Sequence, residues 1–245
     1  MIGNGDQGAK GKGYKPVNKY GANFDIGTAT TPETIWSHGG VFPFLDTGVS
    51  VDVVSSSIND TLLGTGAQQI KITYYLTDNT EAVEIIDMNG TTPVPLSDDY
   101  KISTRIKVES TGVLNTNDGE INIVDRATGL IVYQSVETGE GQTLSAVQIC
   151  PKGKKGLIKK HKVNFAKAQS PAGSADMRFN IRAANGSITT KHPTVISTTK
   201  TEDEYIYEIG GIEMEEGDIA YWQCLSVSAN ATPILARFDV EFTDV

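Results

Sequence analysis

The sequence contains few of the residues that build metal centres and nucleophilic active sites. Among its 245 residues are only two cysteines and three histidines. Cys150 and Cys224 form no metal pattern, and His38, His161 and His192 each stand alone, so no metal and no cofactor is expected. We interpret the histidines as ordinary surface or interface residues. Because no nucleophile-elbow motif marks a catalytic serine either, the sequence predicts a protein without enzymatic activity.

The sequence also lacks a run of about 18 apolar residues, so no transmembrane helix is expected. Its first residues lack the charged-then-apolar pattern of a secretory signal, which favours synthesis and assembly in a cytoplasm. Cys150 and Cys224 lie in apolar, strand-like runs. This setting favours buried free thiols, and a disulfide fits a reducing compartment less well.

Basic residues are outnumbered, with 21 Lys and Arg against 30 Asp and Glu and a net charge of −9. This balance disfavours nucleic acid or an anionic membrane as the main partner of the chain. It favours a partner that carries basic patches. Hydrophobic residues make up 38% of the sequence, which allows a core of modest size.

From residue 48 onward, apolar and polar residues alternate with a period of two, which predicts β-strands. No stretch keeps a helical period. The strands are expected within residues 48–54, 69–76, 82–88, 101–108, 120–124, 129–133, 145–150, 157–165, 176–182, 187–191, 205–209, 218–225 and 236–242. Hairpin turns are expected at Asn89-Gly90 and at residues 125–128.

This spacing of short strands and turns predicts an all-β fold. We expect two β-sandwich or jelly-roll-like domains, at residues 48–143 and 144–245, preceded by an extended N-terminal arm at residues 1–22. The arm is rich in Gly and Lys and cannot bury enough surface to offset its ordering entropy, so we expect a partner to order it. Residues 23–47 are predicted to be a wrapped connector.

Bulky residues of the connector are expected to anchor on the following domain or on a neighbouring subunit. Together with the arm, they form the first predicted interface. Its residues are Lys10, Lys12, Tyr14, Lys15, Trp36, Phe42 and Phe44.

Six lysines lie between residues 152 and 162, and eight acidic residues lie between 202 and 218. One interpretation is that the lysines contact the acidic segment of an identical subunit, which would place Lys154, Lys155 and Lys159 in an interface. The other is that they form the solvent face of an edge strand, where lysine opposes aggregation. DNA binding is a third interpretation, weakened by the overall acidity.

Two polar segments, residues 115–119 and 97–99, carry oxygen ligands suited to calcium. Neither has the spacing of a twelve-residue calcium loop, which favours polar turns.

Three short segments resemble, in their order along the chain, a group of virion structural proteins of marine tailed bacteriophages. They are an Ile-Trp-x-x-Gly-Gly pattern at residues 35–41, an Asn-Gly-Thr-Thr-x-Val turn at 89–94, and a Gln-Thr-Leu-x-Ala run ending in Pro-x-Gly-Lys at 141–154. The resemblance implies an assembly role and supplies no catalytic residues. The Lys-rich turn and the Gly-Lys arm depart from that group.

The predicted function is therefore a non-enzymatic virion protein of a tailed bacteriophage, with capsid decoration or cement as the leading role. The expected partners are other virion proteins, such as the major capsid protein, and further copies of the chain, with a trimer as one form. A tail, connector or fibre-anchoring protein is the alternative in the same class. A carbohydrate- or receptor-binding module is the alternative outside it, with candidate aromatic residues Tyr205, Tyr207, Tyr221 and Trp222.

Overall fold

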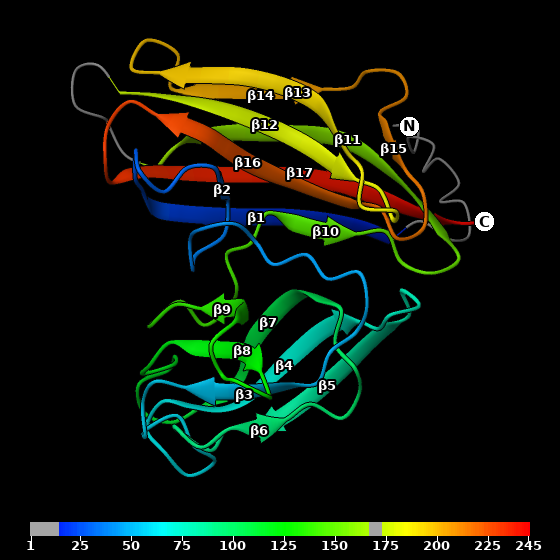
Figure 1. Cartoon of the computed structure of the whole chain (residues 1–245). Coiled ribbons are helices and arrows are strands. Elements are labelled where there is room, and N and C mark those ends of the chain that lie inside the picture. The colour runs from blue at the N-terminus through cyan, green and yellow to red at the C-terminus, as the bar shows by residue number, and fades with distance from the viewer. Residues whose placement is uncertain (1–14, 167–172) are drawn as a thin grey trace, which may run out of the picture.

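The computed structural model describes residues 15–166 and 173–245, and the all-β prediction is confirmed there. These residues form 17 strands and no helix, and every paired strand runs antiparallel to its neighbour. No helix in the described ranges is long and apolar enough to cross a membrane. The strands build two stacked sandwiches of unequal size (Figure 1).

The larger sandwich consists of two five-stranded sheets. One has the order β1-β17-β11-β14 with β15 also beside β11, and the other has the order β10-β16-β12-β13 with β2 beside β16. The strands are β1 (Lys15–Ile26), β2 (Glu33–Thr34), β10 (Val147–Ile149), β11 (Lys154–Phe165), β12 (Ser174–Arg182), β13 (Ile188–Ser197), β14 (Glu202–Ile206), β15 (Ile212–Met214), β16 (Ile219–Val227) and β17 (Thr232–Asp244).

The smaller sandwich consists of a four-stranded sheet, β6-β3-β8-β9, and a three-stranded sheet, β5-β4-β7. All its strands lie inside the range 48–143 that the sequence assigns to the first domain. They are β3 (Val51–Ser55), β4 (Ala67–Tyr75), β5 (Glu81–Asp87), β6 (Val94–Pro95), β7 (Ile102–Thr111), β8 (Ile121–Asp125) and β9 (Val132–Val136).

Alternation of apolar and polar residues accounts for these strands. In β17, Ala236, Phe238, Val240 and Phe242 are buried, while Arg237 between the first two is exposed. Successive side chains of a strand point to opposite faces, so one face of β17 enters the core. There Phe238 packs edge-on against Phe179 of the opposite sheet, with ring centroids 5.2 Å apart.

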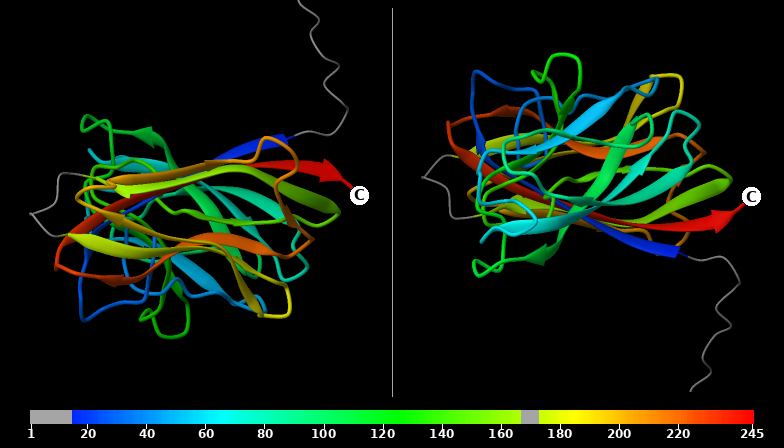
Figure 2. Two further views of the ribbon diagram at one scale, coloured as in Figure 1. Left: turned by 90° about the horizontal axis from the view of Figure 1, so that it is seen from above. Right: turned by 90° about the horizontal axis from the view of Figure 1, so that it is seen from below.

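The prediction of an extended arm over residues 1–22 is wrong for residues 15–22. These residues begin β1, which pairs with β17 from Lys15↔Phe242 to Ile26↔Thr232. Figure 2 shows the two strands side by side, so the first described residue lies near the C-terminus. The larger sandwich therefore contains β1 and β2, which precede the smaller sandwich in the chain, as well as β10 to β17, which follow it. Residues 1–14, including Lys10, Lys12 and Tyr14, lie outside the described residues.

The two predicted hairpins have different outcomes. Strands β8 and β9 pair across residues 125–128, so that hairpin is confirmed. The Asn89-Gly90 turn is present, with Gly90 at a positive φ of 61°, but it does not close a hairpin. It leads from β5, which pairs with β4, to β6, which pairs with β3 in the other sheet. A tight turn of this kind can connect two layers as well as two neighbouring strands.

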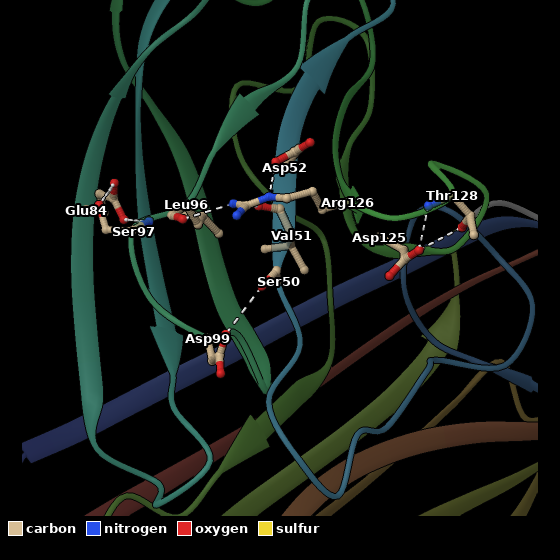
Figure 3. A network of polar contacts seen from close by, with 10 residues as sticks. All are labelled: Ser50, Val51, Asp52, Glu84, Leu96, Ser97, Asp99, Asp125, Arg126 and Thr128. Carbon is tan, nitrogen blue, oxygen red and sulfur yellow. Dashed lines mark hydrogen bonds and ion pairs between the residues drawn. The ribbon is translucent and has the colours of Figure 1, made fainter.

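The guanidinium of Arg126 connects three segments of the smaller sandwich (Figure 3). It forms an ion pair with Asp52 on β3 at 2.6 Å, and it donates to the carbonyl oxygens of Val51 and Leu96. The neighbouring Asp125 carboxylate accepts from the amide and the hydroxyl of Thr128 and stabilises the β8–β9 turn. This network fixes the short strand β6 against β3.

Candidate functional site

The connector residues lie inside the chain and not on a surface for partners. Trp36 and Phe42 are each 2% exposed and belong to an apolar cluster, called here the junction core, between the two sandwiches. Phe44 is half-buried, and its ring lies 4.8 Å from that of Tyr221. Trp36 and Phe42 are therefore packed inside their own chain, against both sandwiches and not only against the following domain, and their assignment to a contact with another subunit is wrong. Phe44 packs beside them with part of its side chain exposed.

The junction core joins residues from both sandwiches. The smaller sandwich contributes Tyr75 and Ile102, and β10 and β16 of the larger one contribute Val147, Ile149, Ile219 and Tyr221. Polar contacts surround it: Arg182 pairs with Asp46 at 2.6 Å, and Lys152 pairs with Asp78 at 2.6 Å. The two sandwiches thus share one continuous buried interface.

The lysine cluster finds its acidic partners within the same chain. Strand β11 carries the lysines and pairs with β14 and β15, which carry the acids. The resulting ion pairs are Lys155–Glu215, Lys160–Glu204 and Lys162–Glu202, and Lys154 pairs with Asp244 on β17. The interpretation that these acids serve an identical subunit is therefore wrong. Strand β11 is also central in its sheet, so the edge-strand interpretation is wrong too.

The remaining predicted interface residues have different surroundings. Lys15 is the first residue of β1 and pairs with Phe242 through the backbone. Lys159 donates to the carbonyl oxygen of Gly210 at 3.3 Å and has no carboxylate partner among the described residues. Among the described side chains, Lys154, Lys155 and Lys159 therefore do not share one contact surface with the connector residues.

Two of the aromatic residues proposed for sugar binding are core residues. Tyr221 is 1% exposed and Trp222 is fully buried, so neither can line a groove. Tyr205 is half-exposed on β14, and its ring lies 4.7 Å from that of Tyr207. Both rings pack against His161, so side-chain packing within the sheet accounts for where Tyr205 and Tyr207 lie.

The histidines and cysteines also have structural surroundings. His161 is fully buried, contrary to the expectation of a surface or interface residue, and stacks on Phe179 at 4.8 Å. Cys150 and Cys224 are free and buried, as predicted, and burial raises the pKa of each thiol to about 12. Both thiols therefore stay protonated and unreactive at neutral pH.

Burial, together with the nearby His192, lowers the pKa of His161 to about 4, while Asp203 opposes the shift. The His161 imidazole therefore binds a proton more tightly in the unfolded chain than in the folded one. The free energy of unfolding consequently falls as the pH drops from about 6.5 to 4. We expect His161 to remove about 2 kcal/mol of the free energy of unfolding between pH 7 and pH 5. Urea unfolding of the parent and of His161→Phe at both pH values measures this loss. His161→Phe should not show this loss between pH 7 and pH 5. The control His38→Phe, at an exposed position, should show the same loss as the parent. Equal pH dependence in all three proteins would refute the assignment to His161.

Neither predicted calcium segment forms a cation cage. The Asp118 carboxylate accepts hydrogen bonds from Ser57 at 2.6 Å and Asn59 at 3.0 Å. The Asn117 amide donates to the carbonyl oxygens of Gly119 and Glu137. Among the described residues, no three His, Cys, Asp or Glu side chains gather as metal ligands. The side-chain oxygens of these turns are used to hold the loops together.

These loops carry an exposed apolar surface that the sequence analysis does not anticipate. Two loops at one end of the smaller sandwich, residues 56–66 and 112–119, lie next to each other because the amides of Gly112 and Leu114 donate to the carbonyls of Gly66 and Thr65 (Figure 1). We call them the loop platform. Its exposed apolar side chains are Ile58 at 75%, Leu62 at 45%, Leu63 at 93%, Val113 at 80% and Leu114 at 45%.

The loop platform is built around one buried carboxylate. Asp60 is fully buried, and its oxygens accept from the amides of Ala67, Asp118 and Gly119 at 2.7–2.9 Å. The hydroxyl of Ser55 donates to it at 2.6 Å. These bonds join both loops to the end of β3, so the apolar side chains above them are held on a fixed base.

A fixed surface of exposed aliphatic side chains is suited to contact with another protein. Full burial of one Leu or Val contributes about 1.5–3 kcal/mol, and such exposed patches mark interaction sites. A signal for it exists in the sequence: Leu62-Leu63 and Val113-Leu114 are apolar pairs inside stretches otherwise made of turn residues. Such pairs are candidates for exposure, although the connector shows that apolar loop residues such as Trp36 can also be buried.

No protein-family model and no curated protein matches the chain. Among solved structures, the chain aligns with the VP2 subviral particle of infectious bursal disease virus at 9% identity, covering 96% of this chain and 81% of that one, with a TM-score of 0.15. T=1 particles derived from the same virus align at 9% identity over 96% and 79% of the two chains, also with a TM-score of 0.15. Overlaps this low carry no inference for this chain.

Proposed function

We propose that the chain is a non-enzymatic structural subunit of a virus particle, and that the loop platform is its contact with a partner protein. The observation that carries this proposal is the set of exposed aliphatic side chains held on the buried Asp60 carboxylate. A rigid apolar surface loses little conformational entropy on binding, so more of the burial energy remains as affinity. The loop platform, and not the buried connector residues Trp36 and Phe42, is therefore the proposed contact surface.

The finer part of the proposal is a capsid decoration or cement role in a tailed bacteriophage. It is supported by the three segments that resemble phage virion proteins, and their places in the fold clarify what they contribute. Gly39, Gly40, Gly90 and Gly141 of these segments all have positive φ values, from 61° to 77°. Backbone positions with positive φ favour glycine, so the glycines shared with the phage proteins are residues that shape the backbone of the fold. The partners would be other virion proteins and further copies of this chain.

Replacing Leu63 and Val113 together by aspartate is expected to reduce incorporation into particles at least tenfold. Two charges would enter an apolar contact, and a loss of about 1.4 kcal/mol already corresponds to a factor of ten. The fold should be unaffected, because both side chains are at least 80% exposed. The measurement is the copy number of the tagged chain in purified particles, by quantitative immunoblot.

Leu130→Asp with Ile209→Asp is the matched control, since these side chains are 85% and 95% exposed but lie outside the loop platform. Its incorporation should equal that of the parent. Equal incorporation of the platform variant would contradict the proposed contact. Gold labelling of purified particles tests the finer role: label on the head supports decoration, label on the tail supports the tail alternative, and unlabelled particles overturn the virion role.

A further inference from the structure

A second surface feature is unrelated to the loop platform. A cavity of about 480 Å³ lies between the two sandwiches, which is the size of a small-molecule site. Its wall includes Lys19 of β1, Thr104 and Arg105 of β7, and Gln148 of β10. We call it the junction cleft. Because strands of both sandwiches line the junction cleft, its shape depends on how the two sandwiches pack against each other.

Two cations of the junction cleft have no carboxylate partner among the described residues. Lys19 is 8% exposed, and its ammonium donates to the carbonyl oxygen of Thr104. Arg105 donates to the side-chain oxygen of Gln142 at 3.0 Å. In the parts of the chain that the structure describes, neither forms an ion pair. The other two lysines of the cleft, Lys152 and Lys154, pair with acids.

Further positive charge lies next to Arg105 on the outer face of the β5-β4-β7 sheet. Lys71 on β4 is directly opposite Lys107 on β7, and Thr73 is opposite Arg105. Like charges directly opposite each other destabilise a pair of strands. Lys107 has one acidic neighbour, Glu109, at 3.8 Å. Positive charge gathers here although the chain as a whole carries a net charge of −9. A carboxylate, Glu81 of β5, also lines the junction cleft, where it accepts a hydrogen bond from the hydroxyl of Tyr75 at 2.8 Å.

We propose that the junction cleft is a binding site for a small organic anion, whose carboxylate or phosphate group is held by Lys19 and Arg105. A Lys and an Arg side by side provide several N–H donors that fit the oxygens of either group. The apolar part of the ligand would pack on Val17 and Pro151, which also line the cleft. This site goes beyond the proposed function and does not rest on it.

The electrostatics of Lys19 agree with this assignment. Burial and, to a smaller extent, the neighbouring Arg105 lower the pKa of Lys19 to about 7. A buried ammonium without a counter-ion is costly, and an anion beside it favours the charged form. Binding should therefore be tighter below pH 7 and should raise the pKa of Lys19.

The test uses the purified full chain with citrate and inorganic phosphate as probes, at pH 6.5 and constant ionic strength. Calorimetric titration is expected to show saturable binding of at least one probe, and the preferred probe identifies carboxylate or phosphate as the ligand group. Lys19→Met and Arg105→Gln should each weaken binding at least tenfold. Lys191→Gln removes a charge from an exposed position outside the cleft and should bind like the parent.

Arg105 is exposed, so its variant should fold normally and keep the test valid if Lys19→Met proves unstable. A second measurement follows the side-chain carbon signals of the lysines by NMR against pH. Saturating probe is expected to raise the pKa of Lys19 by one unit or more, since each unit corresponds to a tenfold preference for the charged form. No saturable binding of either probe, or equal weakening by Lys191→Gln, would overturn the proposal.

Discussion

Replacing Trp36 by alanine is expected to lower the free energy of unfolding by about 3–5 kcal/mol. The indole is 2% exposed in the junction core, and its ring lies 4.9 Å from Phe42 in an edge-on arrangement. Its Nε1–H donates to the carbonyl oxygen of Gly40 at 3.1 Å. The substitution would leave a cavity between the two sandwiches and would remove one of the hydrogen bonds to the Gly40 carbonyl, leaving the one from the amide of Thr34.

Chemical denaturation of the parent and the variant measures this loss. Val41→Ala is the matched control, because Val41 lies in the same segment and is 58% exposed. It should change stability by less than about 0.5 kcal/mol. Calorimetry adds a second readout. If the junction core couples the two sandwiches, the parent should unfold in one transition, and Trp36→Ala should split or broaden it. A loss below about 1 kcal/mol would show that the junction core contributes little.

The period-two alternation predicts most of the strands because it reports which face of a strand is buried. Strand β1 is not predicted, since its buried face includes Lys19, Gly21 and Asn23 and so has no continuous apolar row. It forms because β17 offers a full row of backbone partners, a tertiary effect that outweighs local composition. Gly21 contributes as well: a Cβ at this position would lie 2.2 Å from the amide nitrogen of Ala146, so only glycine lets the strand approach β10 closely.

Contacts between distant segments could be predicted less well than the strands. The opposite charges of residues 152–162 and 202–218 are visible in the sequence, but their meeting within one chain depends on the strand order. Because β11 lies between β17 and the β14 and β15 strands, the lysines face acids of their own sheet. The Lys19–Arg105 pair likewise requires β1 to lie against β7 of the other sandwich.

The buried carboxylate of Asp60 is the second position where a large effect is expected. Asp60→Ala should cost about 3–5 kcal/mol of unfolding free energy. It would leave the amides of Ala67, Asp118 and Gly119 without their acceptor, and each buried unsatisfied donor costs about 1–3 kcal/mol. Denaturation by urea measures the loss. Asp98→Ala, at an exposed turn, should have almost no effect.

A substitution at a neighbouring buried position tests the same structure independently. A Cβ on Gly66 would lie 2.1 Å from an oxygen of Asp60, so Gly66→Ala should displace the carboxylate and destabilise the same loops. Both variants should also reduce incorporation into particles at temperatures where the rest of the chain is folded, because Leu63 and Val113 would lose their fixed base. If both destabilise the chain but leave incorporation unchanged, the contact does not depend on the rigid base, and the role proposed for Asp60 is wrong.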